Sequence, residues 1–107
     1  MDFKIKYSER SSNDISDIID YISDELSNPK AAEKFFVGVS EKIEMLRENP
    51  YLFPLYHDKK LSAEGYRFAI VGNYLMFYVI NDVNSIVNIV RIVFGRRNIP
   101  AIIEAEH

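Results

Sequence analysis

The chain has 107 residues, no cysteine, 48% hydrophobic residues and a formal net charge of −3. This length suits a single domain, residues 1–107, whose core needs neither a disulfide nor a structural metal. The absence of cysteine excludes disulfides and thiolate metal sites, the acidic balance argues against indiscriminate nucleic-acid binding, and no apolar window is long enough for a membrane span.

The first segment, from Phe3 to Tyr7, alternates aromatic or aliphatic residues with lysines, which is typical of a half-buried strand. Ser8 or Ser11 can then cap a helix. An apolar stripe follows at helical spacing: Ile15, Ile18, Ile19, Ile22 and Leu26. The opposite face is acidic and lacks the spacing and glycine of a calcium loop, so we expect it to be solvated. Its acidic residues are Asp14, Asp17, Asp20 and Asp24.

A second helix is predicted after Asn28, which can cap it, and Pro29, which suits a first helical turn. Asn49 and Pro50 end it. Its inner stripe is Ala32, Phe35, Phe36, Val39, Ile43 and Leu46. Because the connection is short, the two helices should form an antiparallel hairpin. Residues 51–64 have no regular period, so an ordered loop is expected, with residues 57–60 exposed.

Three further strands are predicted at residues 66–71, 74–81 and 85–94, which are rich in Val, Ile, Tyr and Phe. Turn residues at 72–73 and 82–84 suit antiparallel hairpins. The predicted fold is α+β: a strand, a two-helix antiparallel hairpin and a three-stranded antiparallel meander, with the helices packed on one face of the sheet. The other face is expected to stay open.

Charge is divided along the chain. Residues 1–48 hold seven Lys or Arg against eleven Asp or Glu, whereas residues 59–97 hold six against two. Strand alternation separates Arg67 from its neighbours and Arg91 from Val90 and Ile92. A charge packed against the helices would be costly, so Arg67 and Arg91 are predicted to face outward. For Arg91, pairing with an acidic residue of a neighbouring element is an equal alternative.

The order of elements resembles the ParE/RelE superfamily of bacterial toxins from toxin–antitoxin modules. The resemblance is carried by the Arg-bearing strand at 66–68, the Val-Gly-Asn-Tyr turn at 71–74 and the Arg-Ile-Val-Phe-Gly-Arg-Arg segment at 91–97, and extends to both helices. It implies a growth inhibitor that is neutralised by a cognate antitoxin encoded beside it. It also implies a hetero-oligomer with the antitoxin. A cytoplasmic location is expected because the chain has no cysteine and its N-terminus alternates instead of forming an apolar run, and no cofactor or metal is expected.

Members of the superfamily differ in target. ParE-like toxins poison DNA gyrase, and RelE-like toxins cleave mRNA on the ribosome. Cleavage needs a proton acceptor, a proton donor and cations beside the phosphate, for which Arg67, Arg97 and His57 are the candidates. RelE-like sequences carry a basic or aromatic residue where this chain has Leu75, Ala69 and the pair at 102–103. These departures favour the ParE-like branch and a non-enzymatic inhibitor. A harmless member that acts only in its antitoxin complex is a further alternative.

The predicted target-binding residues are basic: Arg67, Arg91, Arg96, Arg97, Lys59 and Lys60. The tail, residues 98–107, is expected to join this surface. The predicted antitoxin-binding residues are Tyr66, Tyr74, Tyr78 and Arg91. Cross-strand packing is the alternative role for the tyrosines, and a polar exit from the last strand is the alternative for Arg96 and Arg97.

Overall fold

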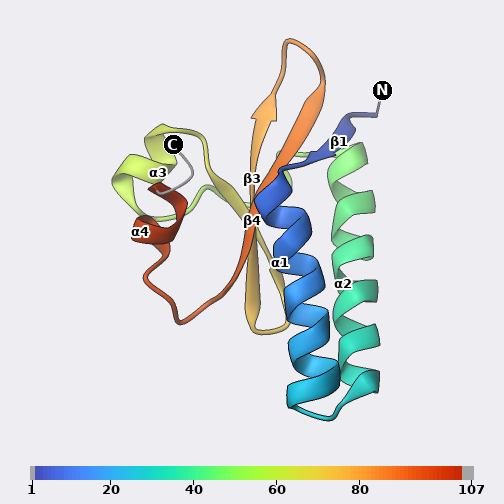
Figure 1. Cartoon of the computed structure of the whole chain (residues 1–107). Coiled ribbons are helices and arrows are strands. Elements are labelled where there is room, and N and C mark those ends of the chain that lie inside the picture. Colours follow the sequence, from blue (N-terminus) through green and yellow to red (C-terminus); the bar gives the residue numbers. More distant parts are fainter. Residues whose placement is uncertain (1, 105–107) are drawn as a thin grey trace.

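The computed structural model describes residues 2–104 and contains one four-stranded sheet with helices on both faces (Figure 1). In chain order the elements are β1 (Lys4–Tyr7), α1 (Glu9–Asp20), the π-helical turn η1 (Tyr21–Glu25), α2 (Pro29–Glu48), α3 (Lys59–Ala63), β2 (Arg67–Val71), β3 (Tyr74–Asn81), β4 (Ile86–Phe94) and α4 (Ile99–Glu104). The predicted α+β class, helix hairpin and meander are confirmed. Two short helices, α3 and α4, were not expected, and residues 105–107 of the predicted tail surface lie outside the described part.

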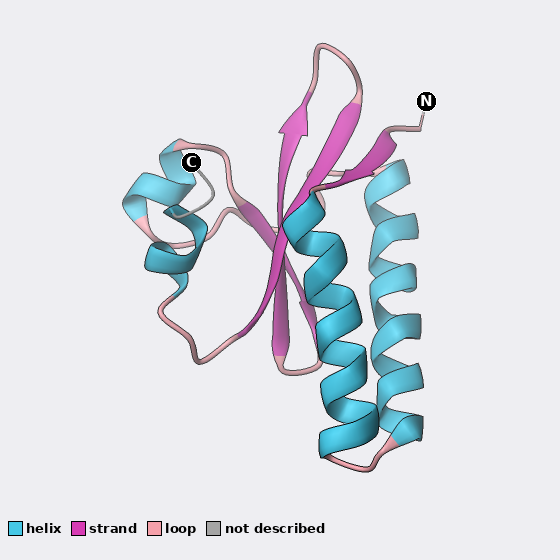
Figure 2. Ribbon diagram, viewed as in Figure 1, coloured by secondary structure: helices cyan, strands magenta, loops and turns pink. Residues whose placement is uncertain are grey.

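The sheet has the strand order β1-β4-β3-β2 (Figure 2). β2, β3 and β4 form the predicted antiparallel meander, and β1 pairs with β4 in parallel, so the complete sheet is mixed. Gly72 has a φ of +59° in the turn between β2 and β3, a conformation that glycine adopts without strain. The parallel pairing places the start of α1 directly beside the central strand β4.

The hairpin of α1 and α2 covers one face of the sheet (Figure 1). Its main core joins the inner side chains of α2 to alternate residues of the sheet. The buried members include Phe35, Val39, Ile43, Leu46, Ala69, Val71, Met76, Tyr78, Val87, Ile89 and Ile92. Two predicted core positions are wrong, because Leu26 and Phe36 are more than half exposed. Leu26 follows the π-helical turn, which displaces it from the stripe of α1.

The prediction that the second face stays open is wrong. α3, α4 and the loop before α3 lie over it and form a second hydrophobic cluster (Figure 2). Its buried members are Tyr56, Leu61, Tyr66, Phe77, Val93, Ile99 and Ile103. The alternating strands place aromatic side chains on this face too, and leaving them in water would forfeit about 1.5–3 kcal/mol for each. The short helices supply the covering side chains.

Candidate interaction groove

Ser8 joins β1, α1 and β4 at one point. Its backbone N–H donates to the carbonyl of Ile89 at 2.9 Å, and its hydroxyl donates to the carbonyl of Val90 at 2.8 Å. The same hydroxyl accepts from the N–H of Ser11 at 3.0 Å, which makes Ser8 the N-cap of α1. α1 therefore starts at the edge of β4.

A β-bulge in β4 lies beside this junction. Phe77 pairs with Arg91 and Tyr78 pairs with Ile89, so Val90 has no partner on β3. The extra residue shifts the alternation: Val90 packs against the second cluster and Ile92 belongs to the main core. The prediction that Val90 and Ile92 share a face is therefore wrong.

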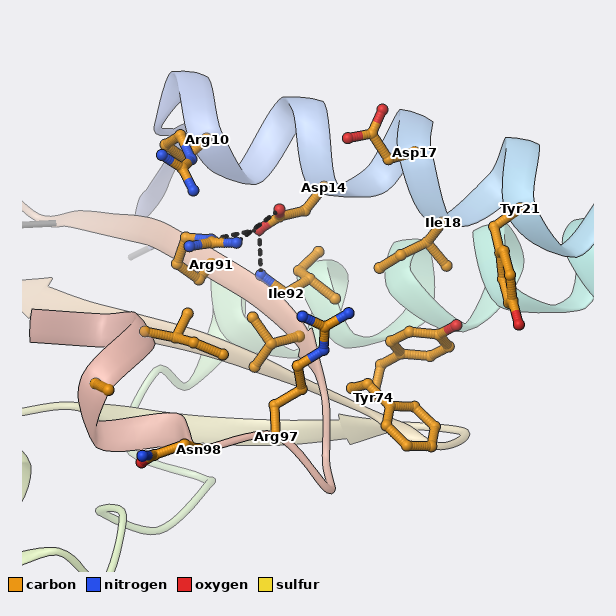
Figure 3. A pocket seen from close by; sticks show the side chains of 14 residues that line it. Arg10, Asp14, Asp17, Ile18, Tyr21, Tyr74, Arg91, Ile92, Arg97 and Asn98 are labelled. Carbon is orange, nitrogen blue, oxygen red and sulfur yellow. Dashed lines mark hydrogen bonds and ion pairs between the residues drawn. The ribbon is translucent and has the colours of Figure 1, made fainter. Parts of the chain in front are cut away.

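Arg91 and Asp14 form an ion pair at the edge of β4 (Figure 3). The two nitrogens Nε and Nη2 of Arg91 lie 2.8 and 3.1 Å from the two carboxylate oxygens, and Asp14 also accepts from the backbone N–H of Ile92 at 2.9 Å. The side chains are only 12% and 13% exposed. The prediction that Arg91 faces solvent is wrong. The prediction that Asp14 lies on a solvated helix face is also wrong. The alternative of an acidic partner for Arg91 is confirmed.

A groove of about 910 Å³ lies between α1 and the segment that runs from the end of β4 into α4. α1 contributes Arg10, Asp14 and Asp17, and the π-helical turn η1 contributes Tyr21 (Figure 3). The four residues are spaced i, i+4, i+7 and i+11 and so share one helical face. This stripe could have been found in the sequence, since it lies next to the isoleucine stripe. Tyr21 opens the π-helical turn, a feature frequent at functional sites.

The opposite wall of the groove contains Arg97, one of the predicted basic residues (Figure 3). Arg97 is exposed and has no ion pair within residues 2–104. Ile102 of α4 gives this wall an apolar part. The helix start at Asn98, Ile99 and Pro100 was a sequence signal for α4, but the segment was too short to be recognised by periodicity.

The other accessible cations lie near the two short helices. Arg96, Lys59 and Lys60 are exposed, and Lys60 Nζ lies 3.3 Å from the carboxylate of Glu104. This ion pair joins α3 to α4 at the surface, where such pairs contribute little to stability. Lys59, Lys60, Arg96 and Arg97 are thus all exposed, and a basic surface formed by them stays a prediction.

Arg67 lies elsewhere, on the same face of β2 as Ala69 and Val71. Its guanidinium donates to the carbonyl of Phe53 at 2.7 Å and stacks 5.0 Å from the ring centroid of Tyr51. The prediction that Arg67 points outward is wrong, because the loop before α3 supplies a carbonyl and an aromatic face that offset the cost of partial burial.

Of the three predicted tyrosines, only Tyr74 lines the groove. Burial raises the pKa of its hydroxyl, and the neighbouring Tyr21 raises it further. Tyr66 is buried in the second cluster, and Tyr78 is fully buried with its hydroxyl donating to the carbonyl of Pro50 at 2.7 Å. Burial raises the pKa of Tyr78 to about 12. The burial of Tyr66 and Tyr78 agrees with the alternative of a packing role.

The candidate nuclease residues are dispersed. Arg67 lies opposite Tyr78, whereas β4 ends opposite Tyr74, just before Arg97. Tyr78 and Tyr74 are four residues apart on β3, so the backbone of Arg67 and the end of β4 are separated by about 13 Å along the strand. His57 follows Tyr56 on the side of the second cluster and stacks on its ring at 4.3 Å between centroids.

Residues 2–104 bring together no group of three or more His, Asp or Glu side chains that could hold a metal ion. No helix within the same residues is long and apolar enough to cross a membrane.

Comparison with known proteins assigns this arrangement to a family. The sequence model for the ParE toxin of type II toxin–antitoxin systems, parDE, matches residues 5–99. The chain therefore belongs to the ParE toxin family. Curated protein sequences give no significant match.

Solved structures with this fold come from two kinds of module. A chromosomal ParDE system of P. aeruginosa aligns with a TM-score of 0.66 and 17% identity over 86% of this chain and 95% of that one. The RelBE2 toxin–antitoxin complex of Mycobacterium tuberculosis aligns with a TM-score of 0.62 and 17% identity over 88% of this chain and 99% of that one. The archaeal RelE–RelB complex of Pyrococcus horikoshii aligns with a TM-score of 0.59 and 16% identity over 91% of this chain and 99% of that one. At these identities the structures support the fold alone.

Proposed function

We propose that this chain is a cytoplasmic growth inhibitor that acts by binding DNA gyrase, and that a cognate antitoxin encoded beside it neutralises it by direct binding. The membership in the ParE toxin family supports the gyrase target over other targets of the superfamily. The neighbouring ParDE and RelBE structures contain an antitoxin, which supports a hetero-oligomer.

The main argument against RNA cleavage is that the candidate catalytic residues lie apart from one another. Arg67 is bound by the loop at Phe53, His57 stacks on Tyr56, and Arg97 lies in the groove. General acid–base catalysis needs its groups within hydrogen-bond reach of one phosphate, and neither Arg67 nor His57 lines the groove that contains Arg97.

The positions at which the sequence departs from a RelE-like centre also support this choice. Ala69 is 1% exposed and belongs to the main core, and Ile103 is 0% exposed and belongs to the second cluster. These apolar residues stabilise the two cores of this chain. A basic or aromatic side chain there would need a different packing.

The gyrase-binding surface in this proposal is the exposed basic region around α3 and the turn before α4. It consists of Lys59, Lys60, Arg96 and Arg97. Arg91 and Arg67 are removed from it because their guanidinium groups are engaged inside the chain. Charged residues at such a rim increase the association rate and the salt dependence of binding.

Controlled expression in a bacterial host tests the proposal. Induction of the chain alone should stop growth, and co-expression of the adjacent reading frame should restore it. Primer extension on transcripts from arrested cells should show intact mRNA, whereas new ends within translated frames would favour the RelE-like alternative. Normal growth with the soluble chain present would mean a harmless member that acts only in its antitoxin complex.

A further inference from the structure

β2 is an outer strand of the sheet, and its outer edge is covered only at its start. The loop before α3 lies along this first part, where the N–H of Phe68 donates to the carbonyl of Pro54 at 3.1 Å. β2 continues to Val71, and no other segment of residues 2–104 pairs with the outer edge there. Residues 69–71 therefore form an open edge.

The turn between β2 and β3 determines which backbone groups point outward. Val71 pairs with Tyr74 across a two-residue turn, so both backbone hydrogen bonds of Val71 go to β3. The N–H and the carbonyl of the preceding residue, Ile70, point the other way, as does the N–H of Phe68 two residues earlier. Within residues 2–104 neither backbone group of Ile70 has a hydrogen-bond partner, and its side chain is 56% exposed.

The middle of α2 lies beside this open edge. Gly38 is so close to β2 that a Cβ on it would be 3.0 Å from a methyl group of Val71. Lys34, Val37 and Glu41 are exposed, share one side of α2 at the spacing i, i+3 and i+7, and line a hollow of about 550 Å³ beside the end of β2. Lys34 and Glu41 have no ion pair within residues 2–104. One positive and one negative charge thus flank the point at which α2 meets β2.

We propose that two copies of this chain associate through this edge. About a twofold axis at Ile70, residues 69–71 of the two copies pair antiparallel, and each Ile70 donates its N–H to the carbonyl of the other. The two sheets then form one continuous sheet with both helix hairpins on the same face. The inference goes beyond the proposed function and depends on neither the antitoxin nor gyrase.

The length of the open edge favours a second copy over a longer peptide. A peptide strand that continued past residue 69 would meet the loop at Pro54, whereas β2 of a second copy turns away at Gly72, opposite Phe68. The open segment is also centred on the residue that faces outward, as a twofold axis requires. The exposed Ile70 side chains of the two copies lie opposite each other, and their contact removes apolar surface from water.

The charges on α2 fit the same axis. The midpoint between Lys34 and Glu41 lies beside Gly38, which packs on Val71 next to Ile70. A twofold axis there places Lys34 of each copy against Glu41 of the other, which forms two ion pairs. Such surface pairs contribute little and the strand overlap is short, so the dimer should be weak.

Sedimentation equilibrium between about 10 µM and 1 mM measures the association of the purified chain. The parent should show a reversible monomer–dimer equilibrium. Lys34→Glu should raise the Kd of the dimer about tenfold, because it places like charges together at both ion pairs. The double variant Lys34→Glu with Glu41→Lys should return the Kd to within about threefold of the parent, since the pairs form again with their charges exchanged. Lys6→Glu makes the same charge change on β1, at the opposite edge of the sheet, and is the matched control.

Amide hydrogen exchange locates the interface. The N–H of Ile70 should exchange about fivefold more slowly at a concentration where the dimer predominates than in the dilute monomer, because the second copy supplies its acceptor. The N–H of Val83, in the exposed turn after β3, is the control and should not change.

Each contrary outcome has one meaning. A chain that stays monomeric at every concentration overturns the inference, and growth arrest by that monomer leaves the proposed function intact. A dimer in which the N–H of Ile70 keeps its exchange rate overturns the location, as does a double variant that associates no better than Lys34→Glu. Protection of Ile70 that appears only after the protein encoded by the adjacent reading frame is added would assign the edge to that protein and also overturn the inference.

Discussion

The ion pair between Asp14 and Arg91 should be the most sensitive polar contact of the groove. Replacing Asp14 by leucine removes two bonds to the guanidinium, at 2.8 and 3.1 Å, and a third bond from the N–H of Ile92. The substitution deprives the Arg91 guanidinium of this carboxylate, although the Arg91 side chain is only 12% exposed. Removing one partner of a buried pair lowers the free energy of unfolding by about 3–5 kcal/mol. Because this pair keeps some exposure, we expect a loss at the lower end of that range, about 3 kcal/mol.

Urea unfolding measures that loss. Asp14→Leu should lower the midpoint at an unchanged m-value, whereas the control Asp17→Asn, at an exposed position of the same helix, should stay within about 0.5 kcal/mol of the parent. The double variant Asp14→Leu with Arg91→Met should recover most of the loss, because it removes the uncompensated charge as well. If Asp14→Leu is as stable as Asp17→Asn, the pair does not hold α1 against β4 and the reasoning fails.

Three further predictions concern the two cores. The pKa of Tyr78 is raised to about 12, so its contribution to stability is complete below about pH 10 and is lost as the pH rises from about 10 toward 12. Unfolding between about pH 9 and 12 should show a decline that is smaller in Tyr78→Phe, where other tyrosines with a raised pKa, such as Tyr74, still contribute, and equal profiles would contradict the burial. Ile103→Ala should cost about 2–5 kcal/mol by thermal unfolding, because α4 covers the second cluster with this fully buried side chain; a loss below about 1 kcal/mol would mean that α4 is not docked. Gly38→Ala should lower the free energy of unfolding by about 1 kcal/mol or more despite the helix propensity of alanine, because the new Cβ would lie 3.0 Å from a methyl group of Val71. A variant that is more stable in urea would contradict this close packing.

The elements that the sequence predicted well are those with a strong local signal. The isoleucine stripe of α1, the Asn28 cap of α2 and the Gly72 turn each depend on a few adjacent residues, and all three are present. α4 has the same kinds of signal, with Asn98 before Ile99 and Pro100, but its six residues are too few for periodicity to be recognised.

The groove itself could not be predicted, because it depends on register. Arg91 meets Asp14 only because β1 is parallel to β4 and because a bulge at Val90 changes the alternation. Neither feature has a local signature in a run of apolar residues. The buried tyrosines were misassigned for a related reason, since Tyr66 is covered by segments that the sequence showed only as an irregular loop and a tail, and Tyr78 faces the main core under the helix hairpin.

If this chain inhibits gyrase by binding it, a supercoiling assay with purified proteins should show the inhibition. Purified chain is titrated into gyrase with relaxed plasmid and ATP, with a sample premixed with the antitoxin as control. Supercoiling should decrease with increasing concentration of the chain and should be restored by the antitoxin. Full supercoiling activity at a saturating concentration of the folded chain would contradict it.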